Sequence, residues 1–299
     1  MKQEKWIKSV EDLGFIISFD EPMFRHTTFR IGGPADVFIR VQNCSKLPEL
    51  LKILNQNNVP VTVIGGGSNL LISDNGVEGA VLYICDDRFT VDGECITAYS
   101  GLKLSKMCQI LKQNSLSGAE FAFGIPGTVG GAVYMNAGAY GGEIVNIISS
   151  CVSITRDGEI IERTAEQLEL GYRTSIFKQN DEIIISATFK LKLGNQNEIE
   201  AQMNDYLERR RTKQPLEFPS AGSTFKRPVG FYAGALIEEC GLKGFSVGDA
   251  EVSKKHSGFV INKGNASCDD VLNLINSIKQ KVFNEKGVLL EPEVIFKGR

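Results

Sequence analysis

The positions of hydrophobic residues along the chain follow two periods, which predict a mixture of helices and strands. Apolar residues spaced three and four apart predict helices near residues 45–57, 104–111, 199–212, 233–240 and 267–286. Short apolar or alternating runs predict strands at residues 37–41, 61–64, 89–91, 95–99, 152–155, 160–162, 183–193 and 288–296. We also expect a short helix and a leading strand in the first twenty residues. Interleaved strands and helices of this kind indicate the α+β class.

Polar and glycine residues set several boundaries between these elements. Ser267 and Asp270 predict a capping box at the start of the last helix, and Gly287 predicts its end. Ser45 is expected to cap the helix near residues 45–57. The polar residues 194–198 form the expected domain boundary. Hairpin turns are expected at Asp92-Gly93 and Asp157-Gly158.

The stretch from Phe123 to Gly142 is the most unusual part of the chain. It holds seven of the 31 glycines and no Lys, Arg, Asp or Glu. Glycines let a ligand approach bare backbone N–H groups, and a cluster of such groups suits a pyrophosphate. A flexible linker would not carry the apolar residues found here, such as Ile125, Val129 and Val133. We therefore expect a ligand cradle rather than a solvated loop.

A second glycine turn follows the strand at 61–64. Gly65, Gly66 and Gly67 precede Ser68 and Asn69, which is the composition of a phosphate-binding loop. The dinucleotide pattern Gly-x-Gly-x-x-Gly fails because position 70 is Leu and no amphipathic helix follows. No Walker-type motif is present either. A nucleotide bound here is thus held neither by a Rossmann device nor by a P-loop.

Three further sets of polar residues are ambiguous from the residues alone. Arg209, Arg210, Arg211 and Lys213 complement a helix dipole or recognise phosphate equally well. Ser223 lies outside any Gly-x-Ser-x-Gly elbow, and a triad with His256 lacks an evident acidic partner. In an extended chain Glu291 and Glu293 would share one face, either as solvated acids of an edge strand or as functional groups.

Composition and charge narrow the class of protein. The chain has 299 residues and a net charge of −3, which gives no support to a nucleic-acid partner. We expect no secretory signal at the charged N-terminus and no transmembrane helix, hence a cytoplasmic protein. The seven cysteines form no Cys-x-x-Cys pair and lie mostly in apolar surroundings, as buried reduced thiols do. With two histidines only, we expect no metal site.

The motifs taken together resemble the bacterial UDP-N-acetylenolpyruvoylglucosamine reductases, flavoenzymes of peptidoglycan synthesis. The resemblance covers nearly the whole chain, and the order and spacing of its motifs make it specific. The residues that carry it are Thr27–Gly33, Ile64–Leu70, Gly124–Gly131, Asn136-Ala137-Gly138, Gly171–Ser175, Ala221-Gly222-Ser223 and Glu291–Val294.

The resemblance implies the vanillyl-alcohol-oxidase type of FAD-binding fold with a C-terminal α+β substrate domain. Residues 1–194 would bind FAD in two lobes, about 1–78 and 79–194, and residues 195–299 would bind the substrate. FAD would be non-covalent, because Ser68-Asn69 stands where some relatives of the fold attach it through a histidine. The implied cofactor-binding residues are Ile64, Gly65, Gly66, Gly67, Ser68, Asn69, Leu70, Gly124, Pro126, Gly127, Thr128, Gly131, Asn136 and Gly138.

The resemblance also implies the reaction and its catalytic residues. NADPH would reduce FAD, which would then reduce UDP-N-acetylglucosamine enolpyruvate to UDP-N-acetylmuramate. Arg173 and Glu293 would stabilise the enolate that forms, and Ser223 would protonate its α-carbon. Lys213 would contact the UDP pyrophosphate, and Arg227 would contact the substrate where the longer variety of the family has Asn.

The chain resembles the shorter variety of the family, since no room is found between Gly142 and Arg173 for an inserted tyrosine loop. We expect a monomer without nucleic-acid or membrane partners. Two alternatives remain open from the sequence. One is an oxidase of the same fold, which would react rapidly with oxygen once reduced. The other is a non-catalytic nucleotide-binding protein, which would have no reason to keep Arg173, Ser223 and Glu293 together.

Overall fold

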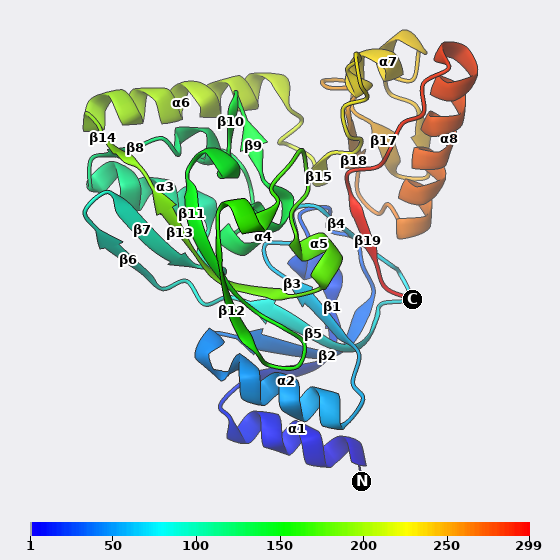
Figure 1. Cartoon of the computed structure of the whole chain (residues 1–299). Coiled ribbons are helices and arrows are strands. Elements are labelled where there is room, and N and C mark those ends of the chain that lie inside the picture. Colours follow the sequence, from blue (N-terminus) through cyan, green and yellow to red (C-terminus); the bar gives the residue numbers. More distant parts are fainter. Residues whose placement is uncertain (1) are drawn as a thin grey trace. The chain divides into compact units, whose positions relative to one another are not determined.

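The computed structural model describes residues 2–299 and contains both helices and strands, which confirms the α+β class (Figure 1). The α-helices are α1 (Lys2–Asp12), α2 (Leu47–Gln56), α3 (Leu104–Gln113), α4 (Val129–Met135), α5 (Phe177–Asn180), α6 (Gln196–Lys213), α7 (Ala233–Glu239) and α8 (Cys268–Lys286). The strands are β1 (Ile16–Pro22), β2 (Pro34–Val41), β3 (Val61–Ile64), β4 (Leu70–Ile72), β5 (Val77–Ile84), β6 (Phe89–Asp92), β7 (Cys95–Tyr99), β8 (Leu116–Ser117), β9 (Gly138–Ala139), β10 (Gly142–Glu143), β11 (Ile148–Ile154), β12 (Ile160–Thr164), β13 (Ile183–Lys190), β14 (Lys192–Leu193), β15 (Ser220–Ser223), β16 (Ser246–Val247), β17 (Ala250–Val252), β18 (Phe259–Asn262) and β19 (Ile295–Lys297).

The chain forms two compact units, each made of several segments. The first unit contains the residues up to Phe19, Val37–Gly66 and Gly79–Arg209. The second contains Asp20–Asp36, Gly67–Glu78 and Arg210–Arg299. The division into FAD-binding and substrate-binding domains near residue 194 stays a functional prediction.

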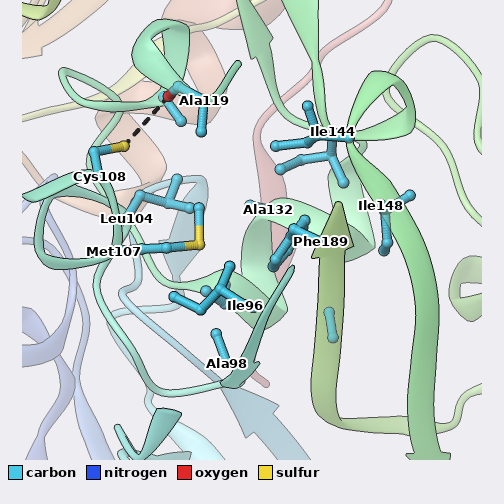
Figure 2. Close-up of a cluster of buried hydrophobic side chains, with 14 of the residues drawn as sticks. Ile96, Ala98, Leu104, Met107, Cys108, Ala119, Ala132, Ile144, Ile148 and Phe189 are labelled. Atoms are coloured by element: carbon cyan, nitrogen blue, oxygen red, sulfur yellow. Dashed lines mark hydrogen bonds between the residues drawn. The ribbon is translucent and has the colours of Figure 1, made fainter. Parts of the chain in front are cut away.

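A five-stranded antiparallel sheet forms the centre of the first unit. Its strand order is β12-β11-β13-β7-β6, and the hairpins at residues 92–95 and 154–160 are those predicted from Asp-Gly turns. A hydrophobic core packs between this sheet, α3 and α4, with Ile96, Leu104 and Phe189 almost fully buried (Figure 2). The thiol of Cys108 donates to the carbonyl oxygen of Ala119 in the same core, at 3.3 Å.

A second sheet, of order β1-β2-β5-β3, lies mainly in the first unit. Strands β3 and β5 pair in parallel, with Val61 opposite Ala80 and Ile64 opposite Tyr83. The leucine stripe of α2 is fully buried in a core that it shares with α1, and the two helices lie side by side (Figure 1). Strand β3 therefore ends at a rigid edge, directly before the first glycine turn.

The second unit is built on a four-stranded antiparallel sheet of order β15-β18-β17-β16. Helix α8 packs along this sheet and against α7 (Figure 1). The predicted capping box is present: the Asp270 N–H donates to Ser267 Oγ, and the Ser267 N–H donates to Asp270 Oδ2, both at 3.0 Å. Gly287 ends α8 with φ +68. Strand β19 pairs in parallel with β4, with Ile295 opposite Leu70.

Four features differ from the predictions. The strand predicted over residues 183–193 breaks at Leu191, whose N–H donates to the Glu94 carbonyl, and Lys192–Leu193 pairs with β8 instead. The strand predicted at 288–296 is reduced to β19, because Pro292 has no N–H for a ladder. Ser45 does not cap α2, since its hydroxyl and its N–H both donate to Asn43 Oδ1. Helix α4 was not anticipated within the glycine-rich stretch.

Candidate functional site

The two predicted glycine cradles meet in the first unit. A β-carbon added to Gly66 would lie 2.8 Å from Gly127 Cα, and one added to Gly65 would lie 2.6 Å from Thr128 Oγ1. Real β-carbons do not approach other atoms this closely, so only glycine lets the two chain segments touch. Gly65 and Gly66 follow β3, while Gly127 and Thr128 precede α4. The structure thus joins two separately predicted loops into one glycine-lined site.

One buried hydroxyl group at this site, Thr128 Oγ1, has no hydrogen-bond partner in the described protein. The hydroxyl of Ser100 interacts instead with the buried thiol of Cys44. Ser100 lies against the start of α4, since its carbonyl oxygen accepts the Gly130 N–H at 2.9 Å and a β-carbon on Gly130 would lie 2.7 Å from Ser100 Cβ. A buried polar atom left without a partner costs about 1–3 kcal/mol. An unpartnered Thr128 hydroxyl beside the close approach of Gly65 fits a site that is completed by a polar ligand, such as a dinucleotide cofactor.

The other predicted cofactor residues of the first unit surround this contact. Gly124 and Pro126 precede Gly127 in the same loop, and Pro126 is exposed. Gly131 lies on α4, where an added β-carbon would meet only Thr128 Oγ1, at 3.9 Å. Ile64 is buried at the end of β3. Gly124, Pro126 and Gly131 thus flank Gly127 and Thr128 along the chain, while Ile64 precedes Gly65.

Asn136 and Gly138 lie at the opposite end of α4, close to Arg173. Asn136 ends α4 in the left-handed region with φ 42 and is 1% exposed. The Gly138 carbonyl oxygen accepts a long hydrogen bond from Arg173 Nη2 at 3.4 Å. Two predicted cofactor residues and the predicted catalytic arginine are thus brought together in the first unit.

Arg173 occupies a tight turn between Gly171 and Thr174. The backbones of Gly171 and Thr174 exchange two hydrogen bonds of 3.2 Å each. Arg173 itself has φ 55, a region that residues with a β-carbon seldom adopt. The Lys178 ammonium group donates to the Arg173 carbonyl oxygen at 2.7 Å. The Arg173 guanidinium also lies 5.2 Å from the centre of the Tyr172 ring.

Gly67, Ser68, Asn69 and Leu70 belong to the second unit. Gly67 has φ +60, and an added β-carbon would lie 1.9 Å from the His26 carbonyl oxygen. Its own carbonyl oxygen accepts the Thr28 N–H at 3.2 Å, and Leu70 begins β4. The predicted motif Thr27–Gly33 therefore supports the second half of the first glycine turn.

Asn69 connects this turn to the predicted catalytic Glu293. Asn69 Nδ2 donates to the Glu293 carbonyl oxygen at 3.1 Å, and the Ile295 N–H donates to the Asn69 carbonyl oxygen at 3.0 Å. The backbone of Glu293 is thereby fixed on one side by the glycine turn. Its side chain is half-buried.

Ser223 and Glu293 lie on neighbouring antiparallel segments of the second unit. The Glu293 N–H donates to the Thr224 carbonyl oxygen at 2.8 Å, and Phe225 is bridged to Pro292. A register shift between Ser220 and Ser223, with Gly222 at φ +77, bulges the end of β15. Ser223 is exposed as a result, while Thr224 is buried and its Oγ1 accepts the Val260 N–H at 2.9 Å.

The contacts of Glu291 and His256 answer two questions about their roles that the sequence left open. Glu291 is exposed and hydrogen-bonded to Lys226, so it is the solvated acid of the pair. The Nδ1 atom of His256 accepts the Gly258 N–H at 3.1 Å, and its ring packs edge-on against Phe259. Within the described chain, no hydrogen bond joins His256 to Ser223. A serine–histidine triad is therefore not formed.

Lys213 and Arg227 are both exposed in the second unit. Lys213 is the last residue of α6, and two residues earlier the Arg211 carbonyl oxygen accepts a hydrogen bond from Lys255 Nζ at 2.7 Å. The Arg227 guanidinium lies 4.4 Å from the centre of the Tyr232 ring. Lys255 and Tyr232 were not predicted from the sequence, because nothing local to them signals that they contact these basic residues.

The seven cysteines are free thiols, and five of them are buried. Burial raises the pKa of the Cys108 thiol to about 12, and burial together with Asp86 raises the pKa of the Cys44 thiol to about 12. Such thiols stay protonated and take no part in chemistry. In the part of the chain that the structure describes, no helix is long and apolar enough to cross a membrane.

Two family models match the chain. Residues 35–164 match the FAD binding domain, and residues 214–297 match the C-terminal domain of UDP-N-acetylenolpyruvoylglucosamine reductase. The reductase of that name from Clostridium tetani is 47% identical over 291 residues, which cover 97% of this chain and 95% of the relative. The similarity therefore extends over both units.

Solved structures agree with the sequence relatives. The UDP-N-acetylenolpyruvylglucosamine reductase of Thermus caldophilus matches with a TM-score of 0.82 and 33% identity, covering 95% of this chain and 99% of that one. An alkyldihydroxyacetonephosphate synthase matches with a TM-score of 0.50 and 16% identity, over 64% of this chain and 40% of that one. The second match concerns the fold alone and supports the predicted vanillyl-alcohol-oxidase type.

Proposed function

Because this chain belongs to the family of the UDP-N-acetylenolpyruvoylglucosamine reductases, we propose that Arg173, Ser223 and Glu293 carry out that family's reaction here. The protein is an FAD-dependent oxidoreductase of peptidoglycan precursor synthesis. It uses NADPH to reduce the enolpyruvyl group of UDP-N-acetylglucosamine enolpyruvate, which yields UDP-N-acetylmuramate. The catalytic and binding roles of its individual residues are proposed below from the structure.

The contact between Gly65–Gly66 and Gly127–Thr128 is the proposed cradle of the FAD pyrophosphate. The close approaches bring the backbones of both glycine loops together, and the Thr128 hydroxyl has no partner in the described protein, as suits a site that binds a phosphate through backbone N–H groups. Ser68 and Asn69 stand where some relatives of the fold attach the flavin through a histidine, so we propose that FAD is held non-covalently. Bound FAD supplies the hydride that the reaction adds to the β-carbon of the enol ether.

Residues of the chain stabilise the negative charge that forms in that reaction and supply its proton. Negative charge develops on the substrate carboxylate as the enolate forms, and we assign its stabilisation to Arg173 and Glu293. Glu293 can serve as a hydrogen-bond donor when it is protonated. We assign protonation of the α-carbon to Ser223, whose hydroxyl is exposed at the bulged end of β15.

The remaining assignments concern domains and substrate. We propose that residues 1–194 bind FAD and residues 195–299 bind the sugar nucleotide, with Lys213 on the UDP pyrophosphate and Arg227 nearby. Exposed basic side chains at the end of α6 and after β15 support this proposal. We also propose that the protein works as a cytoplasmic monomer, which a light-scattering mass near 32.8 kDa would support and a multiple of that mass would refute.

The observation that carries the catalytic proposal is the pairing of the Ser223 and Glu293 segments. Its test is Ser223→Ala, with each half of the reaction followed by the colour of the flavin. Reduction by NADPH should stay near the normal rate. Reoxidation by the enolpyruvyl nucleotide should slow by roughly 10²–10⁴-fold, the usual contribution of a positioned general acid.

Two further variants complete this experiment. Ser223→Cys should recover part of the loss, because a thiol can also donate a proton. Ser220→Ala, at the other end of β15, should leave both half-reactions intact. A Ser223→Ala protein with normal reoxidation would remove the serine from the mechanism, while loss of both half-reactions would indicate a structural role for the segment.

A further inference from the structure

The side chain of Asn136 connects three segments of the first unit. Its Nδ2 atom donates to Glu143 Oε2 at 2.9 Å and to the Gly171 carbonyl oxygen at 3.0 Å. Its Oδ1 atom accepts the Val145 N–H at 2.9 Å. A carboxamide has two N–H groups, and both are used here by acceptors of the protein. Since Asn136 is also only 1% exposed, its side chain makes these hydrogen bonds inside the protein, away from solvent.

The bond to Gly171 reaches the turn that carries Arg173. The Gly171 carbonyl accepts from two donors, the Thr174 N–H that closes the turn and Asn136 Nδ2. The carbonyl oxygen of Arg173 is fixed separately by Lys178 Nζ at 2.7 Å. The two hydrogen bonds hold the peptide groups on either side of Tyr172 and Arg173. They therefore orient a residue whose φ of 55 is unfavourable for a side chain with a β-carbon.

Strain of this kind persists only where the surroundings determine the conformation. Asn136 is itself left-handed, a conformation that asparagine tolerates better than most residues, and this places its amide toward the turn. We propose that Asn136 is a positioning residue for Arg173, a role that rests on the proposed function of that arginine. Its amide acts through the Gly171 carbonyl and not on FAD, although family resemblance alone places it among the cofactor-binding residues.

The test uses Asn136→Gly, which keeps the left-handed backbone free of strain and removes the amide. The matched control is Asn58→Gly, a second left-handed asparagine, with φ 53, exposed in the turn after α2. Three quantities are measured: FAD per polypeptide, the rate of flavin reduction by NADPH, and the rate of reoxidation by the enolpyruvyl nucleotide. In Asn136→Gly only the third should change, falling roughly 10- to 100-fold, as expected for a misplaced catalytic group.

A double-mutant cycle separates positioning from a general structural effect. If Asn136 acts through Arg173, adding Asn136→Gly to Arg173→Ala should change reoxidation by less than about twofold. A further 10-fold loss in that background would overturn the proposal. Loss of FAD from Asn136→Gly would overturn it in favour of a cofactor ligand. A joint fall of all three quantities, absent from Asn58→Gly, would overturn it in favour of a structural role.

Two more outcomes distinguish a failure of the positioning role of Asn136 from a failure of the proposed catalytic role of Arg173. Arg173→Ala with normal reoxidation would refute the catalytic assignment itself. Slow reoxidation in Arg173→Ala together with normal reoxidation in Asn136→Gly would refute only the positioning role of Asn136. If Asn136→Gly fails to fold, Asn136→Asp decides, because it keeps the size of the side chain and presents oxygen acceptors to Gly171 and Glu143. It should slow reoxidation at least as much, and an unchanged rate would contradict the proposal.

Discussion

Replacing Gly66 with alanine tests the glycine-lined site more directly than removing any side chain. The added β-carbon would lie 2.8 Å from Gly127 Cα, 3.4 Å from the Gly127 carbonyl carbon and 3.6 Å from the Thr128 nitrogen. Carbon atoms in good contact are about 3.5–4.0 Å apart, so the two segments must separate by roughly 1 Å. Every neighbour is backbone, which cannot rotate away as a side chain can.

The expected magnitude follows from overpacking. Forcing extra carbon into a filled space typically costs about 1–3 kcal/mol. Because the separated segments are the proposed pyrophosphate cradle, we expect the cost to appear as weaker FAD binding, by about one to two decades in Kd. The backbone contact is local to the loops, so the packing of the cores should be unaffected.

The assay is the FAD-to-protein ratio after purification, followed by titration of the stripped protein with FAD. Gly131→Ala is a folding control, because its β-carbon would meet only Thr128 Oγ1, at 3.9 Å, and alanine favours the helix by about 1 kcal/mol. It should be as stable as the parent protein. Full FAD occupancy and unchanged Kd in Gly66→Ala would refute the placement of the cradle.

Three other outcomes are expected. Lys213→Ala should raise KM for the sugar nucleotide by about one to two decades, because a lost charged hydrogen bond costs about 1.5–3 kcal/mol. Flavin reduction by NADPH should stay unchanged. An unchanged KM would indicate that Lys213 only complements the dipole at the end of α6. Acid precipitation should release intact FAD and leave a white pellet, whereas a yellow pellet would contradict non-covalent binding. Ser267→Ala should lower the free energy of unfolding by about 1 kcal/mol in urea titrations, while Ser277→Ala on the exposed face of α8 should not; equal effects would discount the capping box.

Elements with strong local signals could be predicted from the sequence. The capping box of α8, the two Asp-Gly hairpins and the short apolar strand Val61–Ile64 all occur where expected. In the capping box and the hairpins, neighbouring residues determine the conformation. The left-handed glycine at position 287 and the hydrogen bond from the Asp270 N–H to Ser267 Oγ each act within one turn of the chain.

Elements that depend on distant partners could not be predicted. The pattern of residues 288–296 is that of a continuous strand, but Ile295–Lys297 pairs with β4, while Pro292 forms an isolated bridge to Phe225. Ser45 has the composition of a cap, but Asn43 takes its hydroxyl and N–H. Helix α4 forms despite two of its seven residues being glycine, because Ala132 and Val133 are buried in the core.

The site residues likewise divide into those that a local sequence pattern predicts and those that depend on distant contacts. The turn Gly65–Gly67 and the stretch Phe123–Gly142 were identified as cradles from composition, since glycine clusters are themselves the signal. Their contact through Gly66 and Gly127 spans 61 residues of sequence, 127 minus 66, and no local pattern announces it. Lys178 gave no signal at all, because a lone ammonium group becomes informative only once its neighbours are known.

The central claim is that the flavin of this protein passes its reducing equivalents to an enolpyruvyl nucleotide and not to oxygen. One measurement tests it: the visible spectrum of the purified protein under argon, with NADPH and then UDP-N-acetylglucosamine enolpyruvate added in turn. We expect NADPH to bleach the flavin and the enolpyruvyl nucleotide to restore its colour, with UDP-N-acetylmuramate as the product. A bleached flavin that ignores the nucleotide and regains its colour only when air is admitted would contradict it.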